Sequence, residues 1–180
     1  MFKRLLFAIG SCIVFSSCIY EAEGEGEDEM NRTITEHYSN GQKKYSVSLK
    51  DGMKNGEEVS WFETGGVKEK LSFVNDTLNG TCTWWWKNGF VKQESMWRNG
   101  QEHGKVKCWY ENGSPEQEYT VIDGVMSDTA RFYHDNGNLA SIGVWENGKK
   151  EGEWAYFDSS GVHYKTLIIA QDSVVKEILH

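Results

Sequence analysis

Six glycines at equal intervals constrain the fold of this 180-residue chain more than any other feature of its sequence. These leading glycines are Gly41, Gly65, Gly89, Gly113, Gly137 and Gly161. A second glycine recurs eleven residues after the first and a third four residues later, with Asp76 and Asp128 as the exceptions. Because Asp tolerates left-handed backbone geometry, the pattern indicates a backbone requirement at turns. A constant interval of this kind predicts a repeat protein.

The segments between these glycines predict β-strands joined by tight turns. Four residues before the leading glycine the chain is aromatic in five of the six units, and eight residues after it an apolar side chain recurs. Four of the leading glycines complete an Asn-Gly pair, which is a hairpin signal. Such frequent glycines disfavour helices, and two strands per unit give about ten strands.

A single hairpin of this size is marginally stable in water, so each unit needs its neighbours to cover its aromatic face. We therefore expect an all-β fold, an elongated antiparallel β-meander of about five hairpin repeats. The repeat array should span residues 34–163. The apolar tail 164–180 is expected to form a terminal cap, either as a helix or as strands, because an array of strands otherwise ends in exposed edges.

The spacing Asn-Gly-x(10)-Gly-x(3)-Gly and its aromatic surroundings recur in WWKNGFVKQESMWRNGQEHGK, WYENGSPEQEYTVIDG and FYHDNGNLASIGVWENGKKEGEWAYF. These stretches resemble the MORN repeat variant, a family of bacterial proteins often labelled YwqK-like antitoxins. The resemblance covers about residues 34–163, which is five full units and part of a sixth. It implies a β-hairpin repeat scaffold and no established biochemical activity.

Residues 1–17 have the order of a secretory signal peptide. Lys3 and Arg4 precede an apolar run that is too short to span a bilayer as a helix. The run ends in Phe-Ser-Ser-Cys, which resembles the lipobox of bacterial lipoproteins, so Cys18 is expected to become the lipidated first residue of the mature chain. Phe15 stands where that family more often has leucine, so cleavage by the ordinary signal peptidase stays an alternative.

The segment 18–33 is expected to be an acidic tether. It contains EAEGEGEDE, which has no large apolar side chain and cannot bury surface. Acidic residues just after a lipidated cysteine also resemble the export signals of Bacteroidota lipoproteins that reach the outer cell surface. We expect a protein of the cell envelope, lipid-anchored to the outer membrane, with a periplasmic and an external location both open.

The composition argues against several classes of function. The formal net charge is −8 and no stretch concentrates Lys and Arg, so nucleic acid is not an expected partner. The chain has no paired histidines, Cys-x-x-Cys, nucleophile elbow or phosphate loop, so we expect no metal, no cofactor and no enzyme activity. Cys82 and Cys108 are either the disulfide of an exported protein or two small strand residues.

Two functions of different classes remain. The first is a non-catalytic, envelope-anchored scaffold whose repeat array binds an unknown protein partner. The second is a glycan-binding or cell-wall-binding module that uses exposed tryptophans, and the family label adds an antitoxin-like binding protein as a third alternative. The candidate contact residues are Trp84, Trp85, Trp86 and Trp109. Because side chains alternate along a strand, Trp85 should point away from Trp84 and Trp86 and leave at least one indole on the solvent face.

Overall fold

The computed structural model describes residues 20–21 and 30–180. The predicted signal peptide 1–17 and the predicted lipidation site Cys18 lie outside the described residues, as does most of the acidic tether 18–33. The repeat array and the tail that follows it are described throughout.

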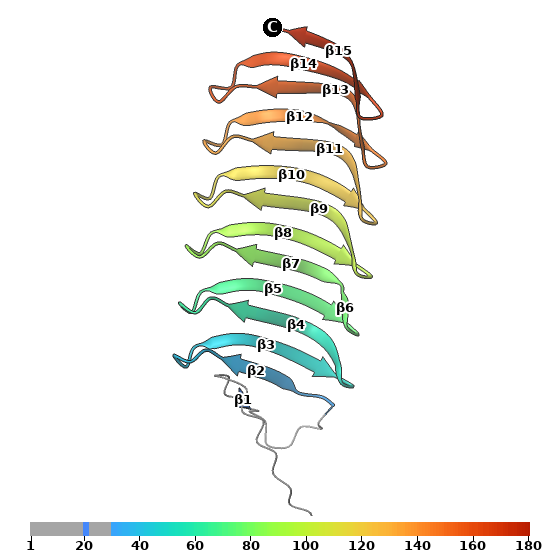
Figure 1. Cartoon of the computed structure of the whole chain (residues 1–180). Helices are drawn as coiled ribbons and strands as arrows, with labels where there is room; N and C mark the ends of the chain where they lie inside the picture. The colour runs from blue at the N-terminus through green and yellow to red at the C-terminus, as the bar shows by residue number, and fades with distance from the viewer. Residues whose placement is uncertain (1–19, 22–29) are drawn as a thin grey trace, which may run out of the picture.

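The described residues form one open, antiparallel, 15-stranded sheet in which strands adjacent in the chain lie side by side (Figure 1). The strands are β1 Tyr20–Glu21, β2 Thr33–His37, β3 Lys43–Lys50, β4 Met53–Trp61, β5 Val67–Val74, β6 Thr77–Leu78, β7 Gly80–Trp85, β8 Val91–Arg98, β9 Gln101–Trp109, β10 Pro115–Ile122, β11 Val125–Tyr133, β12 Leu139–Glu146, β13 Lys149–Phe157, β14 His163–Ala170 and β15 Ser173–Leu179. Strands pair in chain order from β1 to β15 with one exception. The short strand β6 pairs only with β5, and β5 also pairs directly with β7. The described part of the chain contains no helix, and the predicted all-β meander is confirmed.

The connections between strands alternate between two kinds, which lie at opposite ends of the strands and thus along the two long sides of the sheet (Figure 1). Loops that contain the leading glycines follow β2, β4, β7, β9, β11 and β13 along what we call the loop edge, on the left of Figure 1. Two-residue turns follow β3, β5, β8, β10, β12 and β14 along the turn edge, on the right. All six leading glycines have φ between 82° and 91°. In one of these loops the N–H of Gly113 donates to the carbonyl of Tyr110 at 2.9 Å, a turn that left-handed glycine completes.

Each turn on the turn edge joins two strands of a hairpin, and it forms a backbone hydrogen bond with a residue near the start of the strand that precedes this hairpin. Both residues of the turn Asn99-Gly100 have positive φ, 51° and 78°, as in a type I′ hairpin. The N–H of Gly100 donates to the carbonyl of Leu78 at 2.9 Å, and the same bond recurs in all six turns at 2.7–3.1 Å. Asp76 and Asp172 replace the glycine in two of the turns, with φ of 61° and 67°, and their carboxylates also accept the N–H of Lys54 and of Lys150, both at 2.7 Å. The unit length is therefore held by a bond that needs no particular side chain.

The core is formed by side chains on one face of the sheet. Its most buried position recurs at a constant distance after the first five leading glycines, and each of these five side chains is at most 8% exposed. This position holds Glu58, Cys82, Val106, Ala130 and Trp154. The position eight residues after the glycine, which the sequence predicts to face inward, is buried at Val121 and Ile169 and partly buried in the other units. The five units have five different residue types at the deepest position, so the sequence alone does not predict that this position is buried.

Glu58 brings a carboxylate into this core, and two polar neighbours compensate for it. The hydroxyl of Tyr45 donates to Glu58 Oε2 at 2.7 Å, and Lys54 Nζ forms an ion pair with the same oxygen. Burial, and then the hydrogen bond to Glu58, raise the pKa of Tyr45 well above its ordinary value. The buried charge is thus paired and hydrogen-bonded, as its desolvation requires.

The tail that was predicted as a cap continues the meander as β14 and β15. The turn between them contains Asp172, which lies one repeat interval after Gly148 and keeps the same backbone bond as the other turns. Among the described strands β15 pairs with β14 alone, and it exposes Val174, Val175 and Leu179. Within the described residues, the outer side of β15 therefore has no strand partner, and the strand carries exposed apolar side chains.

Trp154 fits into the core because a residue packed against its ring has no side chain. Trp154 is 1% exposed, and its Nε1 donates to the carbonyl of Val144 at 3.3 Å. The rings of Phe132 and Trp145 pack on it with centroids 6.2 and 6.0 Å away. A Cβ atom on Gly143 would lie 2.2 Å from Cδ2 of the indole, so this glycine provides space.

We expect Gly143→Ala to lower the free energy of unfolding by about 1–3 kcal/mol, because the added methyl group overpacks against Trp154. Urea unfolding followed by tryptophan fluorescence measures the change. Gly66→Ala is the matched control, since a Cβ atom there meets nothing within 4 Å, and it should leave the stability nearly unchanged. Wild-type stability of Gly143→Ala would contradict the packing described for Trp154.

Candidate functional site

The loop edge carries a ladder of side chains that joins each loop to the next. The residue three positions before the leading glycine places the polar tip of its ring on a backbone carbonyl 23 residues further along the chain. At one junction, for example, the hydroxyl of Tyr110 donates to the carbonyl of Tyr133 at 2.8 Å. The four such bonds join Tyr38 to Trp61, Trp86 to Trp109, Tyr110 to Tyr133 and His134 to Phe157, at 2.7–2.9 Å.

Asparagine forms a second rung beside each of these bonds. Asn112 Oδ1 accepts the N–H of Ser114 within its own loop at 2.9 Å, and Nδ2 donates to the carbonyl of Asp135 in the next loop at 2.7 Å. Equivalent rungs join Asn40 to Glu63, Asn88 to Glu111 and Asn136 to Ser159, at 2.6–3.0 Å. None of these four asparagines has positive φ, so the Asn-Gly pair here shapes a longer loop and joins two units.

Both rungs are missing at one junction, between the loop after β4 and the loop after β7. Phe62 stands where the complete junctions place tyrosine, tryptophan or histidine, and its ring has no polar tip. Thr64 stands where they place asparagine. Among the described residues, no side chain donates to the carbonyls of Trp85 and Lys87, which are the equivalents of the acceptors elsewhere. The ladder therefore has a gap of one junction.

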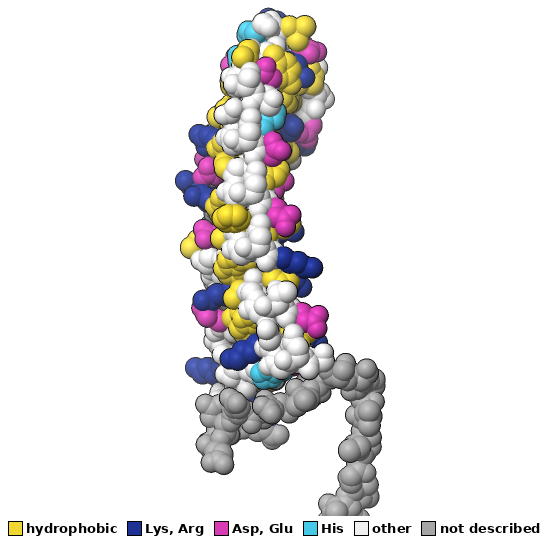
Figure 2. Space-filling model, turned by 90° about the vertical axis from the view of Figure 1, so that its left-hand side faces the viewer, with side chains coloured by type: hydrophobic (Ala, Val, Ile, Leu, Met, Phe, Trp, Pro, Cys, Tyr) yellow, Lys and Arg dark blue, Asp and Glu magenta, His cyan; other side chains and the backbone are white. Residues whose placement is uncertain are grey.

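An aromatic pocket of about 380 Å³ lies at this gap. We call it the tryptophan pocket, and it is lined by Phe62, Lys68, Trp84, Trp85, Trp86, Lys87, Lys92 and Glu111. All three tryptophans are partly buried. Lys92 Nζ lies 4.5 Å from the centroid of the Trp86 ring, a cation–π contact. Figure 2 looks on to the loop edge, where hydrophobic side chains lie among charged ones along the length of the sheet.

Bulges in two strands bring lysines to the tryptophan pocket. The register between β4 and β5 shifts so that Lys68 has no Cα partner on β4. An equivalent shift between β7 and β8 leaves Lys92 without a Cα partner on β7. A bulge re-aims the side chain of the extra residue. With Lys87 in the loop after β7, three lysines and one glutamate surround the aromatic rings, so the pocket has a positive rim.

The structure brings together three of the four predicted contact residues. Trp84, Trp85 and Trp86 line the same pocket, although strict alternation would place Trp85 opposite both neighbours. The register shifts between Trp84 and Trp85, and β7 ends at Trp85, so the alternation does not continue through the cluster. Trp109 lies in a separate hollow with Phe90, Val91 and Gly113, and its carbonyl accepts the rung from Trp86.

Sequence reasoning missed Phe62 and the lysines of the tryptophan pocket. The signal that could have found them is the substitution pattern at two repeat positions. Among the five units that another loop follows, only one has phenylalanine in place of a polar-tipped ring and Thr64 in place of asparagine. The meaning of that pattern depends on the rungs, which are visible only when the loops are placed side by side.

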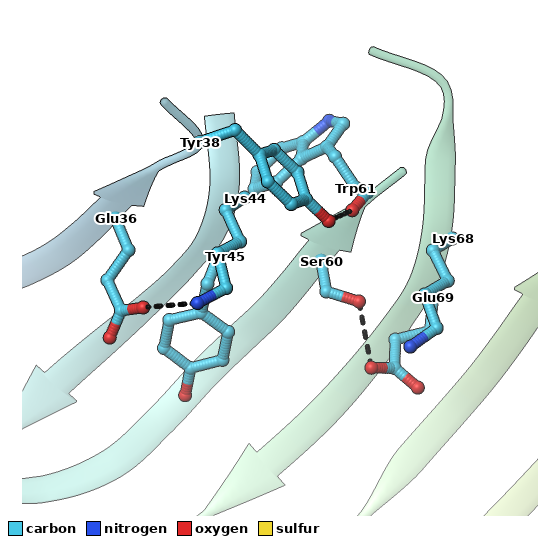
Figure 3. A pocket seen from close by; sticks show the side chains of 8 residues that line it. All are labelled: Glu36, Tyr38, Lys44, Tyr45, Ser60, Trp61, Lys68 and Glu69. Carbon is cyan, nitrogen blue, oxygen red and sulfur yellow. Dashed lines mark hydrogen bonds and ion pairs between the residues drawn. The ribbon is translucent and has the colours of Figure 1, made fainter. Parts of the chain in front are cut away.

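A second pocket, the polar pocket, lies across strands β2 to β5 and holds about 390 Å³ (Figure 3). It is lined by Glu36, Tyr38, Lys44, Tyr45, Ser60, Trp61, Lys68 and Glu69. Lys44 Nζ lies 3.5 Å from a carboxylate oxygen of Glu36, and Ser60 Oγ donates to Glu69 Oε1 at 2.8 Å. Two lysines balance two glutamates, so this pocket offers donors and acceptors without a net charge.

Lys68 and Glu69 connect the two pockets. Lys68 lines both of them. Glu69 lines the polar pocket, and its Oε2 accepts the indole N–H of Trp84 at 3.2 Å. A carboxylate of one pocket thus holds an aromatic ring of the other, and the two form adjacent parts of one surface.

Cys82 and Cys108 are free thiols, and both are buried. They lie on β7 and β9, where Cys82 pairs with Ser95 and Cys108 with Gln93 of the intervening β8. Two strand spacings separate their Cα atoms by about 9–10 Å, beyond the reach of about 7 Å that a disulfide allows. The disulfide alternative is therefore wrong, and burial raises the pKa of both thiols.

The described residues contain no group of three or more His, Cys, Asp or Glu side chains that could hold a metal ion. Nor does any helix in that part of the chain have the length and apolar character needed to cross a membrane. What the two pockets offer is apolar surface, hydrogen-bonding groups and cations, which is chemistry suited to binding.

Three segments of the chain match the family model of the MORN repeat variant, at residues 54–75, 102–123 and 129–149. These matches support the MORN-variant family for the repeats. Repeats of this family commonly form modules that contact proteins or membranes, and the family is generally non-enzymatic. The unit with the three tryptophans lies between the first two matched segments. No curated protein matches the chain.

We expect Cys82 and Cys108 to react slowly with iodoacetamide in the folded protein, because burial shields both thiols and raises their pKa. The rate should increase with pH as more thiolate forms, and it should increase sharply on unfolding. Mass spectrometry of protein unfolded without reductant should find both cysteines alkylated. A cross-linked pair of Cys82 and Cys108 peptides would contradict the free thiols.

Proposed function

We propose that this protein is a non-catalytic binding scaffold of the cell envelope that contacts a protein partner through the tryptophan pocket. One observation carries the proposal: the aromatic pocket coincides with the gap in the loop-edge ladder. At the complete junctions, polar tips and asparagines are used to join neighbouring units. At the gap, no described side chain donates to the carbonyls of Trp85 and Lys87, and aromatic side chains line a pocket.

The composition of the tryptophan pocket supports a protein partner. Tryptophan is enriched at the centres of protein interfaces, because its large ring excludes water and keeps a polar handle. The three lysines favour a partner that carries acidic groups beside an apolar anchor. Because the pocket stands on a hydrogen-bonded sheet, little ordering is needed when the partner binds.

Membrane attachment is the second part of the proposal. Lipidation of Cys18 would supply several acyl chains, and each buried methylene contributes about 0.8 kcal/mol, so the attachment would be effectively permanent. The acidic tether 18–33 would then link the anchor to the sheet. A periplasmic and an external location are both compatible with this arrangement.

Glycan binding is the alternative that a specific observation favours. The indoles of the tryptophan pocket offer flat faces for sugar rings, and the adjacent polar pocket offers carboxylates, hydroxyls and lysines for sugar hydroxyls. An antitoxin-like role is a special case of protein binding, and a lipid anchor fits an intracellular antitoxin poorly.

Trp84→Ala combined with Trp85→Ala should weaken partner capture about thirtyfold or more, because anchor side chains of this kind typically contribute about 2 kcal/mol or more. The bait is the full chain with a C-terminal affinity tag, extracted from the cell envelope in detergent. The affinity for each captured protein is then measured for the wild type and the variant.

Trp109→Ala is the matched control, since it removes the same kind of ring from the loop edge outside the tryptophan pocket. Circular dichroism establishes that both variants are folded. Capture that survives Trp84→Ala with Trp85→Ala in a folded protein would refute the proposal. Capture abolished by a soluble sugar from a glycan panel would favour the glycan alternative.

Cys18→Ser should release the protein from the membrane fraction, because the variant cannot be lipidated. Fractionation of cells that express the tagged full chain, with metabolic labelling by a fatty-acid analogue, measures both effects. Unchanged membrane association and labelling would refute the anchor at Cys18.

A further inference from the structure

The acceptors left open at the gap define the chemistry of a group that fits there. At the four complete junctions, the carbonyl equivalent to that of Trp85 accepts a bond from a phenol, an indole or an imidazole. The carbonyl equivalent to that of Lys87 accepts a bond from an asparagine amide. Phe62 and Thr64 supply neither donor, and the two residues that carry these carbonyls, Trp85 and Lys87, both line the tryptophan pocket.

We infer that the tryptophan pocket recognises a tyrosine side chain of a protein partner, whose hydroxyl donates to the carbonyl of Trp85 while its ring packs against the indoles. This inference rests on the proposed function. Phe62 and Trp85 both line the pocket, so apolar surface and open acceptor occur together. The partner's tyrosine supplies in trans the donor that Tyr38 and Tyr110 supply within the chain at 2.7 and 2.8 Å.

The charges around the pocket select the residues next to that tyrosine. Lys68, Lys87 and Lys92 outnumber Glu111, and all four line the pocket. Opposite charges across an interface favour the correct partner and disfavour others. A tyrosine flanked by acidic residues therefore fits the site better than one flanked by lysine or arginine.

The open carbonyl distinguishes tyrosine from phenylalanine. Phenylalanine would fill the same apolar space and cover the carbonyl of Trp85 without donating to it. A site built around a hydrogen bond discriminates against an analogue that lacks the donor, because its own polar group is then left unpaired. One neutral hydrogen bond corresponds to a difference of about three- to tenfold in affinity.

Three acetylated and amidated pentapeptides test this discrimination: Glu-Glu-Tyr-Glu-Glu and the same sequence with phenylalanine or alanine at its centre. Each is titrated into the full chain in detergent micelles, and the indole N–H signals are followed by NMR. The tyrosine peptide should bind about three- to tenfold more tightly than the phenylalanine peptide and shift the signals of Trp84 to Trp86. Equal affinities, or no binding of the tyrosine peptide, would overturn the inference.

Phe62→Tyr closes the gap from within the chain. The new hydroxyl should donate to the carbonyl of Trp85, raise the melting temperature and remove the preference for the tyrosine peptide. Tyr110→Phe is the reciprocal control, because it opens an equivalent gap at Tyr133 away from the tryptophan pocket and should leave peptide binding unchanged. A tyrosine preference retained in Phe62→Tyr would overturn the inference.

The two proposals fail in different ways. Suppose that Trp84→Ala with Trp85→Ala abolishes partner capture while the peptides show no tyrosine preference: the scaffold function then stands and the tyrosine inference is wrong. If the same double variant captures its partner as the wild type does, the scaffold function through this pocket is wrong, and the tyrosine inference is wrong with it.

Discussion

The backbone hydrogen bond between each tight turn and the chain segment two strands back is the interaction on which the rest of this structure depends. It recurs in all six turns on the turn edge, and it needs only a residue that tolerates left-handed geometry. That is why Asp76 can replace glycine without a change of unit length. A lone hairpin would be marginal in water, so stability comes from the contact of each unit with its neighbours, as in other repeat arrays.

Because a backbone hydrogen bond recurs at every turn of the turn edge, the side chains of the loop edge can vary while the unit length is kept. Its own ladder is made of side chains, so a substitution can remove a rung while the sheet stays continuous. Phe62 and Thr64 remove both rungs at one junction, and the tryptophan pocket occupies that place. A uniform array thereby acquires one specialised unit, which is how a scaffold of similar repeats can present a single binding site.

The core tolerates variation for a related reason. Its deepest position holds alanine in one unit and tryptophan in the next, and the indole ring of the tryptophan fits because the neighbouring Gly143 has no side chain. The same position holds Glu58, where Tyr45 and Lys54 supply the polar partners. Complementarity between adjacent strands, in volume or in charge, therefore matters more here than the identity of any one residue.

The unit length, the all-β class and the turns follow from the sequence, because left-handed geometry is a local requirement that glycine, asparagine and aspartate reveal directly. The tryptophan cluster was visible for the same reason, as neighbours in the chain. The deepest core position, the missing rungs, the bulged lysines and the strand that separates Cys82 from Cys108 were decided by the tertiary structure. Each depends on contacts across strands and between successive loops, and the register shifts that set those contacts arise only when the strands pair.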